Sequence, residues 1–140
     1  MRVVDIGTVR TSPRTPHPER LRAIYDAVSG LLARHEVESA ALESWFVHPV
    51  SKAAMAMAEA RGAILVALAG AGVEVVEYAP NTIKQAATGV GSAGKDQVRA
   101  MVARLSGVEP ASDHAADALA AAICHLSSAA LRGAVRRAGS

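Results

Sequence analysis

Apolar and polar positions along the chain predict strands and helices in alternation. Residues 2–11 are rich in Val, Ile and Thr, which is typical of a β-strand. The prolines of "SPRTPHPER" predict a turn and then the start of a helix. Apolar residues recur at helical spacing from Leu21 to Leu32, so we expect this helix to pack on a sheet with one face.

The remaining pattern continues this alternation to the end of the chain. Strands that alternate with helices predict an α/β fold with parallel strand pairing. The further expected elements are a strand in "VESAALESWF" that ends near Glu43, a helix from about Ser51 to Gly70 or Gly72, a strand in "VEVVEYAP", helices in "NTIKQAAT" and "DQVRAMVARLSG", and a helix from about Asp113 to Arg132.

Composition bounds the domain organisation and the compartment. The 140 residues, 51% of them hydrophobic, predict one domain over residues 1–132 and a solvated, disordered tail at 133–140. The single cysteine, Cys124, fits a reducing cytoplasm and is expected to be a small buried hydrophobe. The start lacks a signal peptide's apolar run and "GAILVALAGAGV" is too short to span a bilayer, so we expect neither export nor a membrane anchor. A net charge of +2 neither requires nor excludes a nucleic-acid partner.

Polar residues begin the otherwise apolar last helix. His114 and Asp117 lie side by side at i,i+3 spacing, with Asp113 close to Asp117. Two interpretations are open from these residues alone. In one, Ser112 or Asp113 caps the helix and Asp117 complements its dipole. In the other, the side chains form part of a site.

Glu43 favours the second interpretation. It lies near the carboxyl end of a predicted apolar strand, the edge where open α/β sheets usually bind their ligands. Carboxylates and an imidazole suit Mg²⁺ or Mn²⁺. Such groups can hold two ions about 3.5–4 Å apart, which activate water and stabilise the leaving oxygen of a phosphodiester.

Several blocks of this sequence resemble the RuvC family of Holliday-junction resolvases. The blocks, in order, are "GTVRTS", "PERLRAIYDAV", "ALESWF", "ARGAILVAL", "YAPNTIKQAATGVGSAGKDQVRAMV" and, most specifically, "HAADALAAAICH". The resemblance covers almost the whole chain. It implies an α/β, ribonuclease H-like mixed sheet with helices on both faces, N-terminally truncated here. It also implies a cytoplasmic, metal-dependent endonuclease that resolves four-way DNA junctions in recombination and repair.

The resemblance assigns a catalytic and metal-binding set. Glu43 and Asp117 match catalytic carboxylates of the family, and His114 matches the preceding metal-site position, where members carry Asp or His. The complete family site binds two Mg²⁺ or Mn²⁺ ions. Asp113 has no family role and is expected to cap the helix.

The resemblance also assigns DNA contacts. Lys84 and Lys95 match basic positions near the scissile phosphate and the junction backbone, and Phe46 matches an aromatic that meets unstacked bases. The alternatives are that both lysines are ordinary solvated side chains and that Trp45 or Phe46 packs against the core. The loop after Phe46 departs from the family because Val50 stands where members tend to have Asn.

Family members act as homodimers because a junction has two-fold symmetry, and they work with RuvA and RuvB. The stretch "SKAAMAMAEARGAILVAL" is a candidate dimer surface because its Ala and Met residues leave a smooth apolar face. The alternative is that this face packs on the sheet.

The family opens with a strand close to Gly-Ile-Asp-Pro-Gly, whose Asp is the first metal ligand, and then a second strand. Here the matching block begins near Met1, so both strands are expected to be absent from this sequence. Three explanations remain open: a wrongly assigned start, a truncated gene copy, or replacement by residues 2–7 with Asp5 as ligand. Two alternatives to the nuclease follow, namely a homologue that binds junctions or dimerises without cleaving, and a chain without a stable fold.

Overall fold

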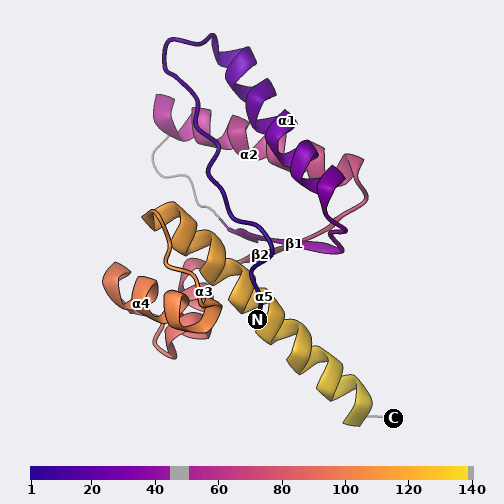
Figure 1. Cartoon of the computed structure of the whole chain (residues 1–140), viewed down its shortest axis with the longest axis vertical. Coiled ribbons are helices and arrows are strands. Elements are labelled where there is room, and N and C mark those ends of the chain that lie inside the picture. The colour runs from indigo at the N-terminus through magenta and orange to yellow at the C-terminus, as the bar shows by residue number, and fades with distance from the viewer. Residues whose placement is uncertain (45–50, 139–140) are drawn as a thin grey trace. The chain divides into compact units, whose positions relative to one another are not determined.

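The computed structural model describes residues 1–44 and 51–138, with side chains in the last helix described as far as residue 130. Most of the predicted elements are present (Figure 1). They are α1 (His17–Arg34), β1 (Ser39–Glu43), α2 (Lys52–Gly70), β2 (Glu74–Tyr78), α3 (Pro80–Thr88), α4 (Lys95–Ser106) and α5 (Asp113–Ala138).

Strands β1 and β2 form a two-stranded sheet in the described part of the chain. At one end the Glu74 amide donates to the Glu38 carbonyl at 3.4 Å, and at the other the Ser44 amide donates to the Tyr78 carbonyl at 2.8 Å. Because both partners advance together along the chain, the pairing is parallel. The predicted parallel pairing is therefore confirmed for these two strands.

The chain divides into two compact units. Unit 1 comprises Met1–Gly7, Ala41–Ser44 and Val76–Ser140, and unit 2 comprises Thr8–Ala40 and Trp45–Val75. Unit 1 contains the carboxyl ends of both strands with α3, α4 and α5. Unit 2 contains α1 and α2.

In unit 1, helices α3, α4 and α5 pack against one another around the buried core (Figure 1). Alanines on the inner face of α5 let the neighbouring helices approach closely, because interaxial distance depends on the side chains at the contact. Val102 and Ala120 are fully buried there, and so is Cys124, as its sequence context predicted. Helices α3 and α4 each end at a glycine with positive φ, Gly89 and Gly107, which is the usual way to close a helix.

Helix α5 begins with a side-chain cap. The Ser112 hydroxyl accepts a hydrogen bond from the Ala115 amide at 3.2 Å, which satisfies one of the free amides of the first turn. The assignment of Asp113 as the cap was therefore wrong, because Asp113 is already the first helical residue. At the other end the helix continues to Ala138, beyond the predicted end at Arg132, since Ala and Arg favour helix.

In unit 2, α1 packs on α2 (Figure 1). The sequence predicted that α1 would pack on a sheet, and its main described partner is instead the helix α2. Helix α2 starts with Ser51 as its cap, whose hydroxyl accepts a hydrogen bond from the Ala54 amide at 3.1 Å.

By length and composition alone α2 could cross a membrane, a test that core helices of soluble proteins also pass. It carries Glu59 and Arg61 and packs on α1, so we do not assign it to a membrane.

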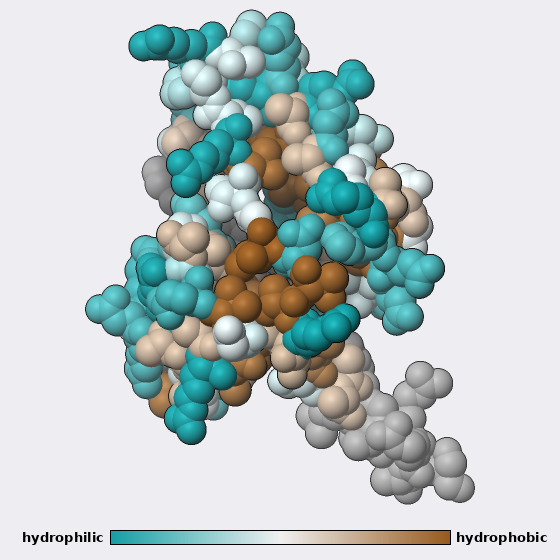
Figure 2. All heavy atoms as spheres, viewed as in Figure 1, coloured by the Kyte–Doolittle hydropathy of each residue, from teal (hydrophilic) through white to brown (hydrophobic). Residues whose placement is uncertain are grey.

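Residues 2–11 do not form the predicted strand. A strand is stabilised by hydrogen bonds to the backbone of a neighbouring strand, and in the part of the chain that the structure describes the sheet contains β1 and β2 alone. Several of their apolar side chains are consequently exposed, with 68% of Val4 and 48% of Val9 accessible. The space-filling view shows apolar side chains, drawn in brown, on the visible surface (Figure 2).

Candidate functional site

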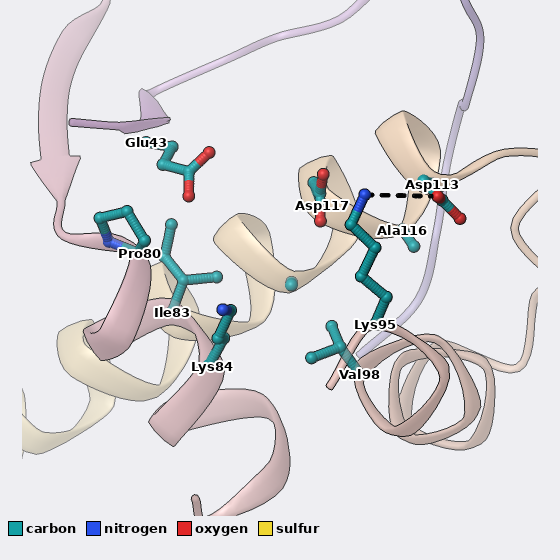
Figure 3. Close-up of a pocket in the computed structure, with 10 residues that line it drawn as sticks. Glu43, Pro80, Ile83, Lys84, Lys95, Val98, Asp113, Ala116 and Asp117 are labelled. Atoms are coloured by element: carbon teal, nitrogen blue, oxygen red, sulfur yellow. Dashed lines mark ion pairs between the residues drawn. The ribbon is translucent and has the colours of Figure 1, made fainter. Parts of the chain in front are cut away.

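A cavity of about 210 Å³ lies within unit 1. It is bordered by the end of β1, the first turns of α3 and α4, and the start of α5 (Figure 3). The residues that line it are Glu43, Pro80, Ile83, Lys84, Lys95, Val98, Asp113, Ala116, Asp117 and Ala120. Four of the six residues predicted for the site are among them, namely Glu43, Lys84, Lys95 and Asp117.

Two carboxylates enter this cavity from different elements. Glu43 is the last residue of β1, and Asp117 follows the first turn of α5. Figure 3 shows their side chains extending toward the same space. Ile83, Val98 and other apolar residues line the same cavity beside the polar groups. Glu43, expected at a strand end, and Asp117, expected at a helix start, thus both line this cavity.

Two lysines add positive charge to the same cavity. Lys84 lies on α3, and Lys95 is the first residue of α4. The Lys95 ammonium is 3.7 Å from a carboxylate oxygen of Asp113 (Figure 3). Acidic and basic side chains thus line the same cavity, an arrangement suited to a phosphate held beside a cation.

Asp113 and Arg99 were not predicted as site residues. Asp113 lines the cavity, and the Arg99 guanidinium lies 3.8 Å from it. Arg99 also donates to the Pro110 carbonyl at 2.5 Å, so it ties α4 to the segment before α5. The available signal was the spacing of Lys95 and Arg99, which at i,i+4 share one face of α4.

The other two predicted site residues, His114 and Phe46, are not among the described residues that line the cavity. His114 is exposed in the first turn of α5 and is not among the residues that line the cavity. Phe46 lies outside the described residues, as does Val50 in the loop that departs from the family. Asp5 belongs to unit 1 and is also not among the lining residues.

The carboxylates fit a hard divalent cation. Within residues 1–44 and 51–130, no three His, Cys, Asp or Glu side chains are placed to hold a metal ion. Mg²⁺, however, keeps several waters and is commonly bound through one or two carboxylates together with substrate phosphates. Glu43 and Asp117 supply two such carboxylates, so the donor set fits a cation that is completed by water and substrate.

Comparison with known proteins identifies the family. A family model described as crossover junction endodeoxyribonuclease RuvC matches residues 1–125. The chain belongs to the RuvC family. A RuvC from Alkalilimnicola ehrlichii is 48% identical over 140 residues, which cover 99% of this chain and 84% of the relative. A RuvC from Treponema denticola is 44% identical over 122 residues, covering 86% and 68%.

Solved structures of the family are also similar. The structure of Thermus thermophilus RuvC has a TM-score of 0.79 at 39% identity, covering 88% of this chain and 75% of that one. A structure described as Thermus thermophilus RuvC in complex with Holliday junction substrate has a TM-score of 0.79 at 40% identity, covering 84% and 73%. The predicted α/β, ribonuclease H-like fold is thereby confirmed.

Proposed function

We propose that this RuvC family member is a metal-dependent endonuclease that resolves four-way DNA junctions by phosphodiester hydrolysis, in recombination and repair. One observation carries the proposal: Glu43 and Asp117, which are far apart in the sequence, line one cavity together with Lys84 and Lys95. The similarity to a RuvC solved with Holliday junction substrate supports the choice of DNA.

Each polar group of the cavity has a role in this proposal. Glu43 and Asp117 would hold the cation, Mg²⁺ or Mn²⁺, and the chemistry that such an ion would supply is the activation of water and the stabilisation of charge on the leaving oxygen. The complete family site holds two ions, and water and substrate phosphate oxygens would complete the ligands that Glu43 and Asp117 supply here. Lys84 and Lys95, which line the same cavity, would neutralise a phosphate of the DNA backbone bound there.

We propose His114 as the third member of the set, on the basis of its family position. It precedes Asp117 by three residues on α5, so the two side chains are neighbours on the helix surface. The imidazole is exposed in the first turn of α5, and histidine is the side chain that most often serves as a general acid or base. Phe46 is proposed to contact unstacked bases near the crossover.

The enzyme is proposed to act as a homodimer, with RuvA and RuvB as further partners. A two-fold junction requires two symmetric cuts, which a symmetric dimer supplies. Helix α2 supports this because Met55, Met57 and Val66 are each more than half exposed on it. A cytoplasmic location is proposed because the only cysteine of the chain, Cys124, is a buried free thiol.

A second candidate function is junction binding without cleavage. It is favoured by the observation that the described residues gather no three metal-binding side chains. The two candidates differ in one result, which is whether the chain cuts a junction that it binds.

Cleavage of a synthetic four-way junction in Mg²⁺ or Mn²⁺ tests the proposal. We expect symmetric cuts from the parent, and losses of at least about 100-fold in cleavage rate for Glu43→Gln and Asp117→Asn. Glu74→Gln is the matched control because Glu74 is exposed at the opposite end of the neighbouring strand. Binding of the junction should persist in all variants. Cleavage by Glu43→Gln at the parent's rate would overturn the proposal, and a folded parent that binds without cutting would establish the second candidate.

A further inference from the structure

Tyr78 and His125 form a partly buried contact within unit 1. The Tyr78 hydroxyl is 2.8 Å from the His125 Nδ1, and the two rings meet edge to face with centroids 5.8 Å apart. Tyr78 is only 9% exposed. A buried tyrosine hydroxyl needs a hydrogen-bond partner, because leaving it without one costs free energy.

The Tyr78 backbone holds the strand end that carries Glu43. The Ser44 amide, next to Glu43 in the chain, donates to the Tyr78 carbonyl at 2.8 Å. Among the described residues, this bond lies at the carboxyl end of the β1–β2 pair, and terminal bonds open more easily than central ones. Holding Tyr78 in place therefore limits the motion of Glu43.

His125 connects this strand end to the helix that carries Asp117. Both His125 and Asp117 lie on α5, and the hydrogen bond from Tyr78 reaches that helix two turns after Asp117. Glu43, Ser44, Tyr78, Asp117 and His125 all belong to unit 1. The Tyr78–His125 contact is thus a direct side-chain link between the supports of the two site carboxylates.

We infer that Tyr78 and His125 are positioning residues, which fix the separation of Glu43 and Asp117 so that both bind one cation. The inference rests on the proposed function. Neither side chain lines the cavity, so they act through the strand end and the helix and do not touch the substrate. The other role open to this pair is core packing alone, which predicts altered stability without altered metal affinity.

The test compares Tyr78→Phe, His125→Leu and His125→Asn in the full chain. Tyr78→Phe keeps the ring and removes only the hydroxyl, and Asn can place a polar atom near the position of Nδ1. We expect Tyr78→Phe and His125→Leu to speed hydrogen exchange of the Ser44 amide and to weaken Mn²⁺ binding, each by roughly 3- to 10-fold, the range for one lost hydrogen bond. The cleavage rate constant should fall with unchanged junction affinity, and excess metal should restore it. In His125→Asn, the Ser44 exchange rate, the Mn²⁺ affinity and the cleavage rate constant should all lie closer to the parent's values than in His125→Leu.

Tyr25→Phe on α1 is the matched control because it removes a hydroxyl from the only other tyrosine. Unchanged Ser44 exchange and unchanged Mn²⁺ affinity in Tyr78→Phe would overturn the inference, whatever the melting temperature does. If His125→Leu fails to fold, Tyr78→Phe and His125→Asn still decide the question. A parent that neither cuts junctions nor binds Mn²⁺ would instead defeat the proposed function, and the Ser44 exchange rates would still show whether the hydrogen bond orders the strand end.

Discussion

The Lys95 ammonium lies 3.7 Å from the Asp113 carboxylate at the edge of the cavity that also contains Glu43 and Asp117. Both side chains of the pair are mostly exposed, at 83% for Lys95 and 56% for Asp113. Exposed ion pairs contribute little stability, so Lys95 can leave Asp113 for a phosphate at small cost. Asp113 therefore adds a negative charge to the cavity, and its ion pair with Lys95 does little to fix the position of the lysine side chain.

Asp113→Asn should strengthen junction binding by about two- to threefold, because it removes a negative charge beside the proposed phosphate position. Cleavage should stay within about threefold of the parent, since Asp113 is not assigned as a metal ligand. Binding is measured by fluorescence anisotropy of a labelled junction at several metal concentrations. A loss of cleavage as large as that of Asp117→Asn would mean that Asp113, and not His114, completes the metal site.

His114→Ala should lower the cleavage rate by about 10²-fold or more, as expected for loss of a proton-transfer group. Junction affinity should change little, because the imidazole is not among the residues that line the cavity. The matched control is His35→Ala, which removes an imidazole from unit 2. An unchanged rate in His114→Ala would remove this residue from the catalytic set.

Lys84→Ala and Lys95→Ala should each weaken junction binding and reduce the slope of log affinity against log salt by about one. The reason is that each lysine that contacts a phosphate displaces a bound counterion. Arg22→Ala is a control because Arg22 is exposed on α1 and paired with Asp26. A slope equal to the parent's in both lysine variants would show that neither lysine contacts the DNA backbone.

Ser112→Ala should destabilise the chain by about 1 kcal/mol, the usual value of an N-cap side chain. Ser112→Asp should retain most of the stability, because Asp can also accept from the Ala115 amide. Urea unfolding followed by circular dichroism gives both values. Equal stability of the parent and Ser112→Ala would show that the start of α5 is held by other contacts.

Burial raises the pKa of the Cys124 thiol, while a hydrogen bond with Ser128 lowers it in part. The unfolded thiol therefore ionises at lower pH than the folded one, so the free energy of unfolding should fall as the pH rises above about 8.5, the ordinary thiol pKa. The parent should lose more stability than Cys124→Ala between pH 7.5 and 9.5. In the folded parent a thiol reagent should react only as fast as the chain opens. Rapid labelling of the native chain would contradict the buried position of Cys124.

Local sequence patterns predicted well those elements whose start and end signals lie within their own sequence. Helices α2, α3 and α4 follow from capping, proline and glycine signals in their own sequences, and their bounds lie close to those expected. Residues 2–11 have strand composition but form no strand, because a strand depends on a partner that local composition does not report.

The sequence indicated which residues would line the cavity only in part, and the chemistry assigned to them stays a prediction. The sequence pattern places Glu43 at the end of a strand and Asp117 at the start of a helix, and from these two positions their proximity could be predicted. His114 was predicted for the site, but Asp113 lines the cavity in its place. Which of these two neighbours lines the cavity depends on the direction of the side chains around the first turn of α5. The Tyr78–His125 contact joins positions distant in the sequence, and no periodicity could have revealed it.

The most direct test of the central claim is Mn²⁺-induced line broadening in NMR spectra of the parent chain. If Glu43 and Asp117 bind one cation, substoichiometric Mn²⁺ should broaden the resonances of both residues together, and Glu43→Gln should weaken the broadening at Asp117. Broadening at only one of them, or equal broadening at Asp117 in the parent and in Glu43→Gln, would contradict a shared metal site.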